Sequence, residues 1–239
     1  ANAAAASNTA GKEERVQRIV FVRHGVAQHN FRGADLSSPT LFDPALVTQG
    51  KIGALEVGPK IKLWFSTKSQ KVELVIASPL TRCLQTAALA FFPGDDYNER
   101  SETGQNQRIR LVSVENIREA YGAHYPDKRR RKSLLVQHWP MVEFDKHLTE
   151  QDELWAESSR ESYESIERRA ASFLQKLCQL PETNIVVVSH GVFLEVLFHK
   201  FDPRALEGGR RVYNCDAFCS ECISSATGSF LRLQKTSLI

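Results

Sequence analysis

Two apolar runs in this chain end in the same pair of residues, His-Gly. The first run, at residues 18–25, reads RIVFVRHG, and the second, at residues 184–191, reads NIVVVSHG. A short, continuous apolar run is typical of a strand buried on both faces of a parallel sheet. Polar groups that follow such a strand lie at the carboxyl edge of the sheet, where open α/β sheets bind ligands. The pattern therefore predicts His24 and His190 as site residues, although a lone histidine in a strand-end turn can also be purely structural.

Two more predicted strands also end in polar or charged segments. Residues 72–77 (VELVIA) are followed by SPLTR at 78–82, and residues 109–114 (IRLVSV) are followed by ENIREAYG at 115–122. Strands that alternate with helices indicate a mostly parallel α/β sheet, whose carboxyl ends gather at one crevice. The side chains that we expect to meet there are Arg23, His24, Arg82, Glu119 and His190.

This set of side chains is suited to phosphate. Guanidinium groups match the oxygens of a phosphate with two parallel hydrogen bonds, which an ammonium or a neutral donor cannot do. Each strand end is weak evidence by itself. Together the four strand ends would require four independent coincidences, so the sequence predicts a phosphate site.

The helices expected between these strands can be placed by their first residues. A helix from Thr48 to about Ser66 would begin with Thr48 as its N-cap. We expect a kink or break at Gly58-Pro59, because an interior proline costs about 3 kcal/mol. A second helix would open with Ser78 as N-cap and Pro79 at its first position.

The rest of the chain divides into periodic and irregular segments. Apolar residues at three- and four-residue spacing predict a helix over 161–180, and a buried helix is expected at 192–198. A short helix at 150–157 and a terminal strand pair within 211–233 are weaker expectations. Residues 1–14 are predicted to be a disordered leader because they are rich in Ala, Asn and Ser and then charged.

Residues 15–239 are therefore expected to form one domain with two loop insertions. These insertions lie at about 95–107 and 123–140, where no periodicity is visible. Loops of this kind commonly carry specificity, so we expect the choice of substrate to depend on them.

Composition and charge bear on three questions: nucleic-acid binding, membrane insertion and the cellular compartment. The chain has 31 Lys and Arg against 28 Asp and Glu, a formal charge of +3, which is too small to indicate nucleic acid. No apolar run approaches the roughly 18 to 20 residues of a membrane span. Five cysteines, an odd number, in a chain of this size favour reduced thiols and an intracellular, cytoplasmic location.

Two local clusters leave alternatives open. The basic run at 128–132 is most simply a solvated loop, but it could also be an anionic-substrate lip or a nuclear or nucleic-acid patch. Cysteines at 215, 219 and 222 raise the question of zinc. A structural zinc site needs four ligands, usually in two separated pairs, and no second pair follows, which favours a strand that happens to carry thiols.

The ordered motifs resemble those of the histidine phosphatase superfamily, in its phosphoglycerate mutase-like branch. The resemblance runs from about residue 18 to residue 235 and rests on RHG at 23–25, SPLTR with QTA at 78–87, RE at 118–119 and SHG at 189–191. It implies a three-layer α/β sandwich, with helices on both faces of the sheet, and a two-step reaction through a phosphohistidine.

The resemblance also implies roles for individual residues. His24 would be the nucleophile and Glu119 the proton donor. The phosphate ligands would be Arg23, Asn30, Arg82 and His190. No metal and no cofactor is required, because positioning and electrostatic stabilisation by the arginines and a protonated His190 would supply most of the catalysis.

Several departures from the family pattern keep alternatives open. The segment around Glu119 reads IREA, whereas glycolytic mutases show Asn-Glu-Arg, so mutase activity is in doubt. The segments RE at 118–119 and DKR at 127–129 are similar to those of a eukaryotic subgroup. Glu115 is a near competitor and Glu102 a distant competitor for the role of proton donor.

The leading hypothesis is a cofactor-free phosphomonoesterase that acts on a small phosphorylated metabolite. A phosphoglycerate mutase is the alternative among enzymes. A binding module for phosphorylated ligands that has lost catalysis is the alternative outside them. The intact set of catalytic residue types speaks against the last, and nucleic-acid binding is not favoured because the basic run lacks interleaved aromatic residues.

Overall fold

The computed structural model describes residues 14–93 and 109–239, in which the chain forms one seven-stranded sheet. The strands lie in the order β4-β3-β2-β5-β1-β6-β7. Their bounds are Glu14–Arg23 (β1), Leu74–Ala77 (β2), Arg110–Ser113 (β3), Val142–Phe144 (β4), Asn184–Ser189 (β5), Ala217–Ser225 (β6) and Phe230–Leu238 (β7).

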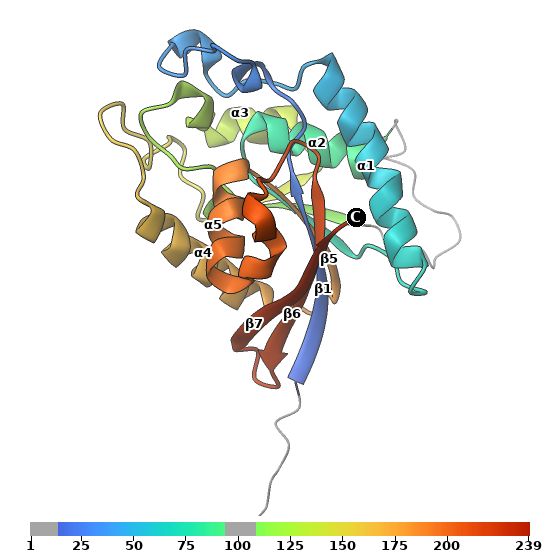
Figure 1. Ribbon diagram of the computed structural model, residues 1–239. Helices are drawn as coiled ribbons and strands as arrows, with labels where there is room; N and C mark the ends of the chain where they lie inside the picture. The colour runs from blue at the N-terminus through green and yellow to red at the C-terminus, as the bar shows by residue number, and fades with distance from the viewer. Residues whose placement is uncertain (1–13, 94–108) are drawn as a thin grey trace, which may run out of the picture.

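The sheet is mostly parallel, as the sequence predicted. Strands β1 to β5 pair in parallel, whereas β6 runs antiparallel to β1 and β7 antiparallel to β6. The apolar runs of β2 and β5 are buried along their whole length, because helices cover both faces of the sheet. Figure 1 shows β1 running up to the upper edge of the sheet. The segments that follow the parallel strands gather above this edge.

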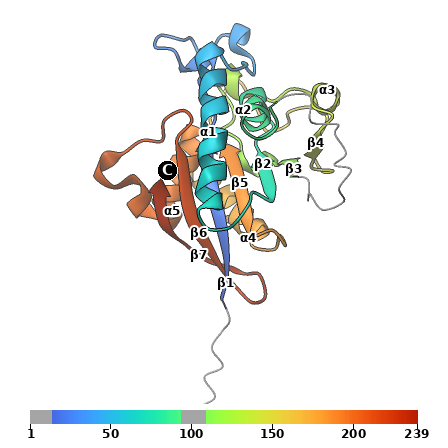
Figure 2. The same cartoon turned by 90° about the vertical axis from the view of Figure 1, so that its right-hand side faces the viewer.

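Helices lie on both sides of the sheet, which confirms the predicted three-layer α/β sandwich. Helices α4 (Tyr163–Leu177) and α5 (Gly191–Phe201) cover one face, and α1 (Thr48–Ser66) and α2 (Thr81–Phe91) cover the other (Figures 1 and 2). Alternate residues of β1 point to opposite faces. Its Phe21 belongs to the core beneath α4 and α5, and its Val22 to the core beneath α1 and α2.

The predicted starts of two helices were wrong. Helix α1 has Val47 rather than Thr48 as its N-cap. Helix α2 begins at Thr81 after an extended Leu80, so Ser78 is not its N-cap. The Ser78 hydroxyl lies instead against the ring of His190.

The expected kink or break at Gly58-Pro59 does not divide α1, which runs on as one helix. Gly58 is buried, and a side chain on it would collide with the carbonyl oxygen of Ala90 in α2, so the glycine lets the two helices approach closely. Pro59 and Leu55 are exposed. Water can therefore reach the Leu55 carbonyl that the missing proline N–H leaves without a helical partner.

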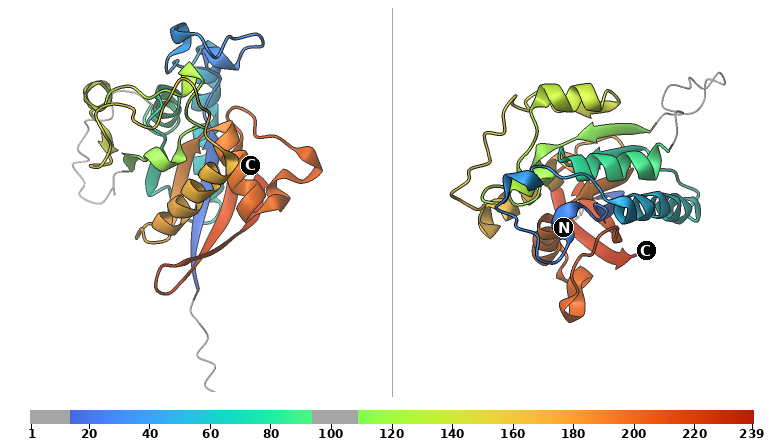
Figure 3. Two further views of the ribbon diagram at one scale, coloured as in Figure 1. Left: turned by 90° about the vertical axis from the view of Figure 1, so that its left-hand side faces the viewer. Right: turned by 90° about the horizontal axis from the view of Figure 1, so that it is seen from above.

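The segment between β3 and α4 holds more structure than the sequence indicated. It contains the 3₁₀ helices η4 (Glu115–Ile117) and η5 (Tyr125–Asp127), the short helix α3 (Lys132–His138) and strand β4. Residues 150–157, by contrast, form turns rather than the expected short helix. Seen from the left and from above in Figure 3, this segment forms one flank of the molecule.

Other expectations fall at the ends of the described residues or outside them. Residue 14 was assigned to the leader but begins β1, while residues 1–13, the loop at 95–107 and Glu102 lie outside the described residues. The terminal strand pair is confirmed as β6 and β7, ending later than expected at Leu238. In the part of the chain that is described, none of the helices has the length and apolar character of a bilayer crossing.

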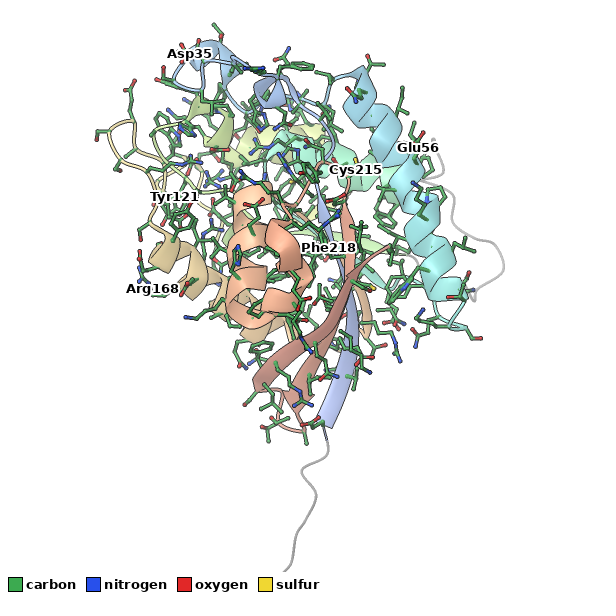
Figure 4. The ribbon with its side chains drawn as sticks, in the orientation of Figure 1. Asp35, Glu56, Tyr121, Arg168, Cys215 and Phe218 are labelled. Atoms are coloured by element: carbon green, nitrogen blue, oxygen red, sulfur yellow. The ribbon has the colours of Figure 1, made fainter. Side chains whose placement is uncertain are left out.

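Strand β6 carries two of the clustered cysteines, Cys219 and Cys222, as expected of a strand that bears thiols. Cys222 faces Cys178 of the α4 end, with 3.5 Å between the sulfur atoms. Cys215 lies just before the strand, near its upper end (Figure 4). Nowhere in residues 14–93 and 109–239 do three His, Cys, Asp or Glu side chains gather as metal ligands would.

Candidate active site

The two His-Gly pairs meet because β1 and β5 are neighbours in register. Arg23 pairs with Ser189 at the last step of the parallel ladder, and the backbone N–H of His24 donates to the Ser189 carbonyl at 3.0 Å. The next residue of each strand is therefore a histidine at the same height above the sheet. The rings of His24 and His190 lie with their centroids 5.1 Å apart, and both side chains are buried.

Close packing around position 25 explains why a glycine follows His24. A side chain at this position would collide with the carbonyl oxygen of Gly50, at the start of α1. The N–H of Gly25 donates to the Thr86 hydroxyl at 3.0 Å, and its carbonyl lies 2.7 Å from Nδ1 of His24. The turn is thus held close to α1 and α2, and it fixes the orientation of the His24 ring.

The partners of His24 determine its tautomer. A carbonyl can only accept, so Nδ1 carries the proton and donates to Gly25. The other ring nitrogen, Nε2, accepts from Nε of Arg82 at 3.1 Å. Burial and the positive charges of Arg82 and Arg23 hold the pKa of His24 well below its ordinary value. The ring is therefore neutral near pH 7, with its lone pair on Nε2.

Arg82 is completely buried, and each of its nitrogens has a partner. Besides the bond to His24, Nη1 donates to the Pro126 carbonyl at 2.6 Å and Nη2 to the Asp127 carboxylate at 2.8 Å. Both of these acceptors belong to η5. The sequence singled out Arg82 but gave no role to the residues that hold it.

His190 has different partners from His24. Its Nε2 lies 2.7 Å from the Ser78 hydroxyl and 3.3 Å from the Cys83 sulfur. Burial and the charge of Arg82 hold the pKa of His190 well below its ordinary value as well. The ring is therefore neutral in the ligand-free site, and the protonated His190 expected during catalysis stays a prediction.

Glu119 joins the same group from the end of β3. Its two carboxylate oxygens accept from the backbone N–H groups of Ala120, at 3.0 Å, and Val192, at 3.2 Å, in the first turn of α5. Burial first, and then the negative charge of Asp127, raise the pKa of Glu119 above its ordinary value. This direction is the one that a proton donor needs, and the role of Glu119 stays a prediction.

Glu115, the near competitor, is differently placed. Its Oε1 accepts from Nη1 of Arg118 and from Nε of Arg129, both at 2.9 Å. This contact set suits a structural ion pair rather than a group that must give up a proton.

Arg23 and Asn30 complete the predicted set. The Arg23 guanidinium packs against Gly191, where a side chain would come within 3.2 Å of its central carbon, and Nη1 donates to the Val212 carbonyl at 2.7 Å. Its Nε is buried and has no hydrogen-bond partner among the described residues. The side chain of Asn30 bonds its own turn at Ala27 and lies 3.1 Å from the ring of His29, rather than pointing to His24 directly.

The basic run at 128–132 is only in part the solvated loop that was expected. Arg129 is buried, and its Nη2 donates to the carbonyls of Thr149, at 2.9 Å, and Gln151, at 2.8 Å. Arg130 pairs with the buried Asp43 at 3.0 Å. Arg129 is turned inward because the segments around it supply carboxylates and carbonyls from elsewhere in the sequence, whereas Arg131 is exposed.

Three functional candidates were missed by reasoning from the sequence: Asp127, Arg160 and Ser78. Asp127 was noted only as part of a motif, and Ser78 was assigned to a helix cap. Arg160 lies in a segment without periodicity, yet it pairs with Asp127 at 2.7 Å. The one signal for Asp127 was its place in the DKR motif, which did not indicate its contact.

The sequence has relatives among known proteins. The sequence profile of the histidine phosphatase superfamily (branch 1) matches residues 19–232. A phosphoglycerate mutase-like protein of Arabidopsis thaliana is 32% identical over 206 residues, 78% of this chain and 75% of the relative. A phosphomutase-like protein of Candida albicans is 31% identical over 222 residues, covering 84% of this chain and 65% of the relative.

Solved structures share the fold at low sequence identity. A mycobacterial glucosyl-3-phosphoglycerate phosphatase has a TM-score of 0.58 and 16% identity, covering 94% of this chain and 98% of that chain. The phosphoserine phosphatase of Entamoeba histolytica, solved with 3-phosphoglyceric acid, has a TM-score of 0.51 and 18% identity, covering 92% and 96%. The chain belongs to the histidine phosphatase superfamily, as its motifs predicted, and is an enzyme of that superfamily.

Proposed function

We propose that this enzyme is a phosphomonoesterase that transfers the phosphoryl group of a small phosphorylated metabolite to His24 and then to water. The observation that carries the proposal is the pair of contacts made by the His24 ring. Its Nδ1 proton is held by the Gly25 carbonyl, and its Nε2 lone pair faces the Arg82 guanidinium. A neutral imidazole with a fixed tautomer is an activated nucleophile at neutral pH.

Substrate binding would exchange one hydrogen bond for another at Arg82. In the ligand-free site Nε of Arg82 donates to the lone pair that must attack phosphorus. A phosphate oxygen is a stronger acceptor for a guanidinium N–H than a neutral ring nitrogen is. Arriving phosphate therefore takes the donor from His24 and frees the nucleophile in the same step.

His190 and Arg23 would bind the phosphoryl oxygens. His190 lies beside His24 and is neutral before phosphate arrives, so the negative charge of the substrate is what would raise its proton affinity. Arg23 brings a buried Nε that has no partner among the described residues. Such a donor gains a hydrogen bond when an anion enters.

Glu119 would donate a proton to the leaving oxygen and later accept one from the attacking water. Its raised pKa and its place in the group with Arg82 and Arg23 support this role. Glu115 is already paired with two arginines, which argues against it as the donor. The assignment separates two acids that the sequence left as competitors.

The names of similar proteins support a small phosphorylated metabolite as the substrate. One structural neighbour is named a glucosyl-3-phosphoglycerate phosphatase and another a phosphoserine phosphatase. The sequence relatives are named for mutases, so transfer between two hydroxyls of one substrate is the second candidate. The two reactions share the phosphohistidine and differ in what receives the phosphoryl group.

The decisive experiment measures phosphate release from p-nitrophenyl phosphate and from a panel of sugar, amino-acid and nucleotide phosphates. His24→Ala is expected to abolish release, and unchanged turnover in this variant would overturn the mechanism. When bisphosphoglycerate is added, the phosphoryl group should still be transferred to water, so phosphate release should continue. Stimulated transfer between hydroxyls would assign the enzyme as a mutase instead.

The proton donor is tested with matched acid variants. Glu119→Gln is expected to slow alkyl phosphates by about 10²- to 10⁴-fold, because a poor leaving group needs the proton. It should slow p-nitrophenyl phosphate much less. Glu115→Gln is the control, and if it produces this selective loss in place of Glu119→Gln, the two roles must be exchanged.

A further inference from the structure

Asp127 is a buried carboxylate in the active site to which neither the family motifs nor the proposed reaction assigns a step. It ends η5, and its side chain is 6% exposed. Its Oδ1 accepts from Nη2 of Arg82 at 2.8 Å, next to the bond from Nη1 of Arg82 to the Pro126 carbonyl. Two consecutive residues of η5 therefore hold one edge of the guanidinium, and the opposite edge presents Nε to His24.

The second oxygen of Asp127 is held from another direction. Arg160 donates from Nη1 to Oδ2 at 2.7 Å and also to the Gly122 carbonyl at 3.0 Å. The Arg160 side chain is 30% exposed, so it lies between Asp127 and solvent. Side-chain contacts therefore connect the surface to the nucleophile without a break, in the order Arg160, Asp127, Arg82 and His24.

Asp127 also affects the proton donor without touching it. Its negative charge is the second cause, after burial, of the raised pKa of Glu119, and the charge of Arg82 acts against it. Both oxygens of Asp127 are occupied by guanidinium donors, whereas those of Glu119 accept only from backbone N–H groups. Asp127 is therefore held between two guanidinium groups, and Glu119 is held by the backbone.

We propose that Asp127 is a positioning residue for this reaction: it fixes the Arg82 guanidinium against His24, and its charge acts on Glu119 as well. The inference rests on the proposed function. It adds that one carboxylate, Asp127, acts on both the proton donor Glu119 and the phosphate-binding Arg82. The segment between β3 and α4, which contains Asp127, thereby acts on transfer of the phosphoryl group to His24 and on its later transfer to water.

The main test is Asp127→Asn, which keeps the size of the side chain and removes its charge. The kcat for an alkyl phosphate is expected to fall by about 10- to 100-fold, because Arg82 loses its anchor and Glu119 its charged neighbour. The alkaline limb of the pH profile should move to lower pH, since Glu119 loses its proton more readily. Turnover of p-nitrophenyl phosphate, which needs little help from an acid, should fall less.

Asp152→Asn is the matched control. Asp152 is an equally buried carboxylate that pairs with Arg118 at 2.7 Å, but it contacts neither Arg82 nor Glu119. Loss of this pair should lower the melting temperature and leave the alkaline limb in place. A shift in Asp127→Asn that Asp152→Asn reproduces would be a general effect of a broken ion pair, and it would overturn the proposal.

Arg160→Gln gives a test of opposite sign. It removes the positive partner of Asp127, so the full negative charge faces Glu119 and the alkaline limb should move to higher pH. Because Arg160 is partly exposed, this variant keeps the proposal testable even if Asp127→Asn does not fold. A shift to lower pH in Arg160→Gln would contradict the proposed electrostatic link.

A readout that does not depend on turnover separates this proposal from the proposed function. The Glu119 carboxyl can be titrated by ¹³C NMR in wild type, in Asp127→Asn and in Arg160→Gln. Its pKa is expected to fall in Asp127→Asn and to rise in Arg160→Gln. Failure of the proposed function appears as activity that survives His24→Ala. Failure of this inference appears as an unmoved Glu119 titration, or as loss of alkyl phosphate turnover in Asp127→Asn but not in Glu119→Gln, which would make Asp127 the acid.

Discussion

His24 and His190 occupy equivalent positions and are set up for different chemistry. Each follows the last residue of a parallel strand, each is followed by glycine, and their rings are neighbours. His24 has one nitrogen on a carbonyl and the other on Arg82. His190 has the Ser78 hydroxyl and the Cys83 thiol nearest to Nε2, and it occupies the N-cap position of α5. Similar strand ends therefore do not make similar histidines.

The difference comes from what the neighbouring elements present to each ring. The turn at Gly25 is pressed against α1, so a carbonyl oxygen faces Nδ1 of His24 and leaves Nε2 as the lone pair. His190 lies at the start of an eleven-residue helix, whose N-terminus favours negative charge. One histidine is thus prepared to attack phosphorus, and the other lies where a phosphoryl oxygen is stabilised.

The largest expected effect tests this comparison directly. His24→Ala should lower turnover by about 10⁴-fold or more and should form no phosphoenzyme. His190→Ala should lower kcat by about 10²- to 10³-fold, the cost of losing one donor to the transition state. It should still form acid-labile phosphohistidine. Mass spectrometry of enzyme quenched at alkaline pH after mixing with p-nitrophenyl phosphate would measure both.

His29→Ala is a matched control for that experiment. His29 is a half-buried histidine whose ring centroid lies 5.7 Å from that of His24, and among the described residues its ring has one hydrogen bond, to the Asn30 side chain. Its variant should be phosphorylated nearly as wild type is. Phosphoenzyme in His24→Ala together with none in His190→Ala would reverse the two roles.

The pH dependence of stability is the second prediction. Burial and the nearby arginines hold the pKa of His24 and of His190 well below 6.5, and burial lowers the pKa of His29 to about 2. Below pH 6.5 the unfolded chain therefore binds protons that the folded chain does not. Each group should reduce stability by about 1.4 kcal/mol per pH unit as the pH falls from 6.5 toward its folded pKa.

Urea denaturation at a series of pH values would measure this loss. Replacing His24 with Gln should make the slope below pH 6.5 shallower, because one of the groups that take up protons on unfolding is gone. An unchanged slope would mean that His24 already titrates normally in the folded protein. In that case its ring would be charged, and not a nucleophile, in mildly acidic solution.

Much of this site could be predicted because strand ends are visible in the sequence. Continuous apolar runs reveal buried parallel strands, and parallel strands bring their carboxyl ends to one edge. His24, His190, Arg82 and Glu119 each follow such a run within a few residues. Their convergence needed only the topology of the sheet, which alternating strands and helices indicate.

The remainder could not be predicted because its contacts join distant segments that have no periodicity. The charge pattern of residues 128–132 indicates a solvated loop, and nothing local shows that Arg129 is buried against Glu115 and the Thr149 carbonyl. The pairing of Asp127 with Arg82 and Arg160 likewise depends on how the segment folds back. Local pattern reading also assigned Ser78 to a helix cap, whereas tertiary packing turns its hydroxyl to His190.

The smallest expected effect concerns this serine. Ser78→Ala removes the hydroxyl 2.7 Å from Nε2 of His190 and leaves the Cys83 sulfur as its neighbour. We expect kcat to fall by about tenfold, as is typical when the partner that orients an active-site histidine is lost. The free energy of unfolding should fall by about 1 kcal/mol, the net value of one hydrogen bond. The ¹⁵N chemical shifts of the His190 ring should change, while those of the His24 ring should not.

Ser189→Ala separates orientation of the ring from simple loss of a buried hydroxyl. Ser189 precedes His190 and is equally buried, but its hydroxyl donates to the Ile117 carbonyl at 2.7 Å. Its variant should lose similar stability and keep its kcat and its His190 shifts. If the two serine variants lose activity equally, the hydroxyl of Ser78 does not orient His190, and the contrast between the two histidines must come from the helix N-terminus alone.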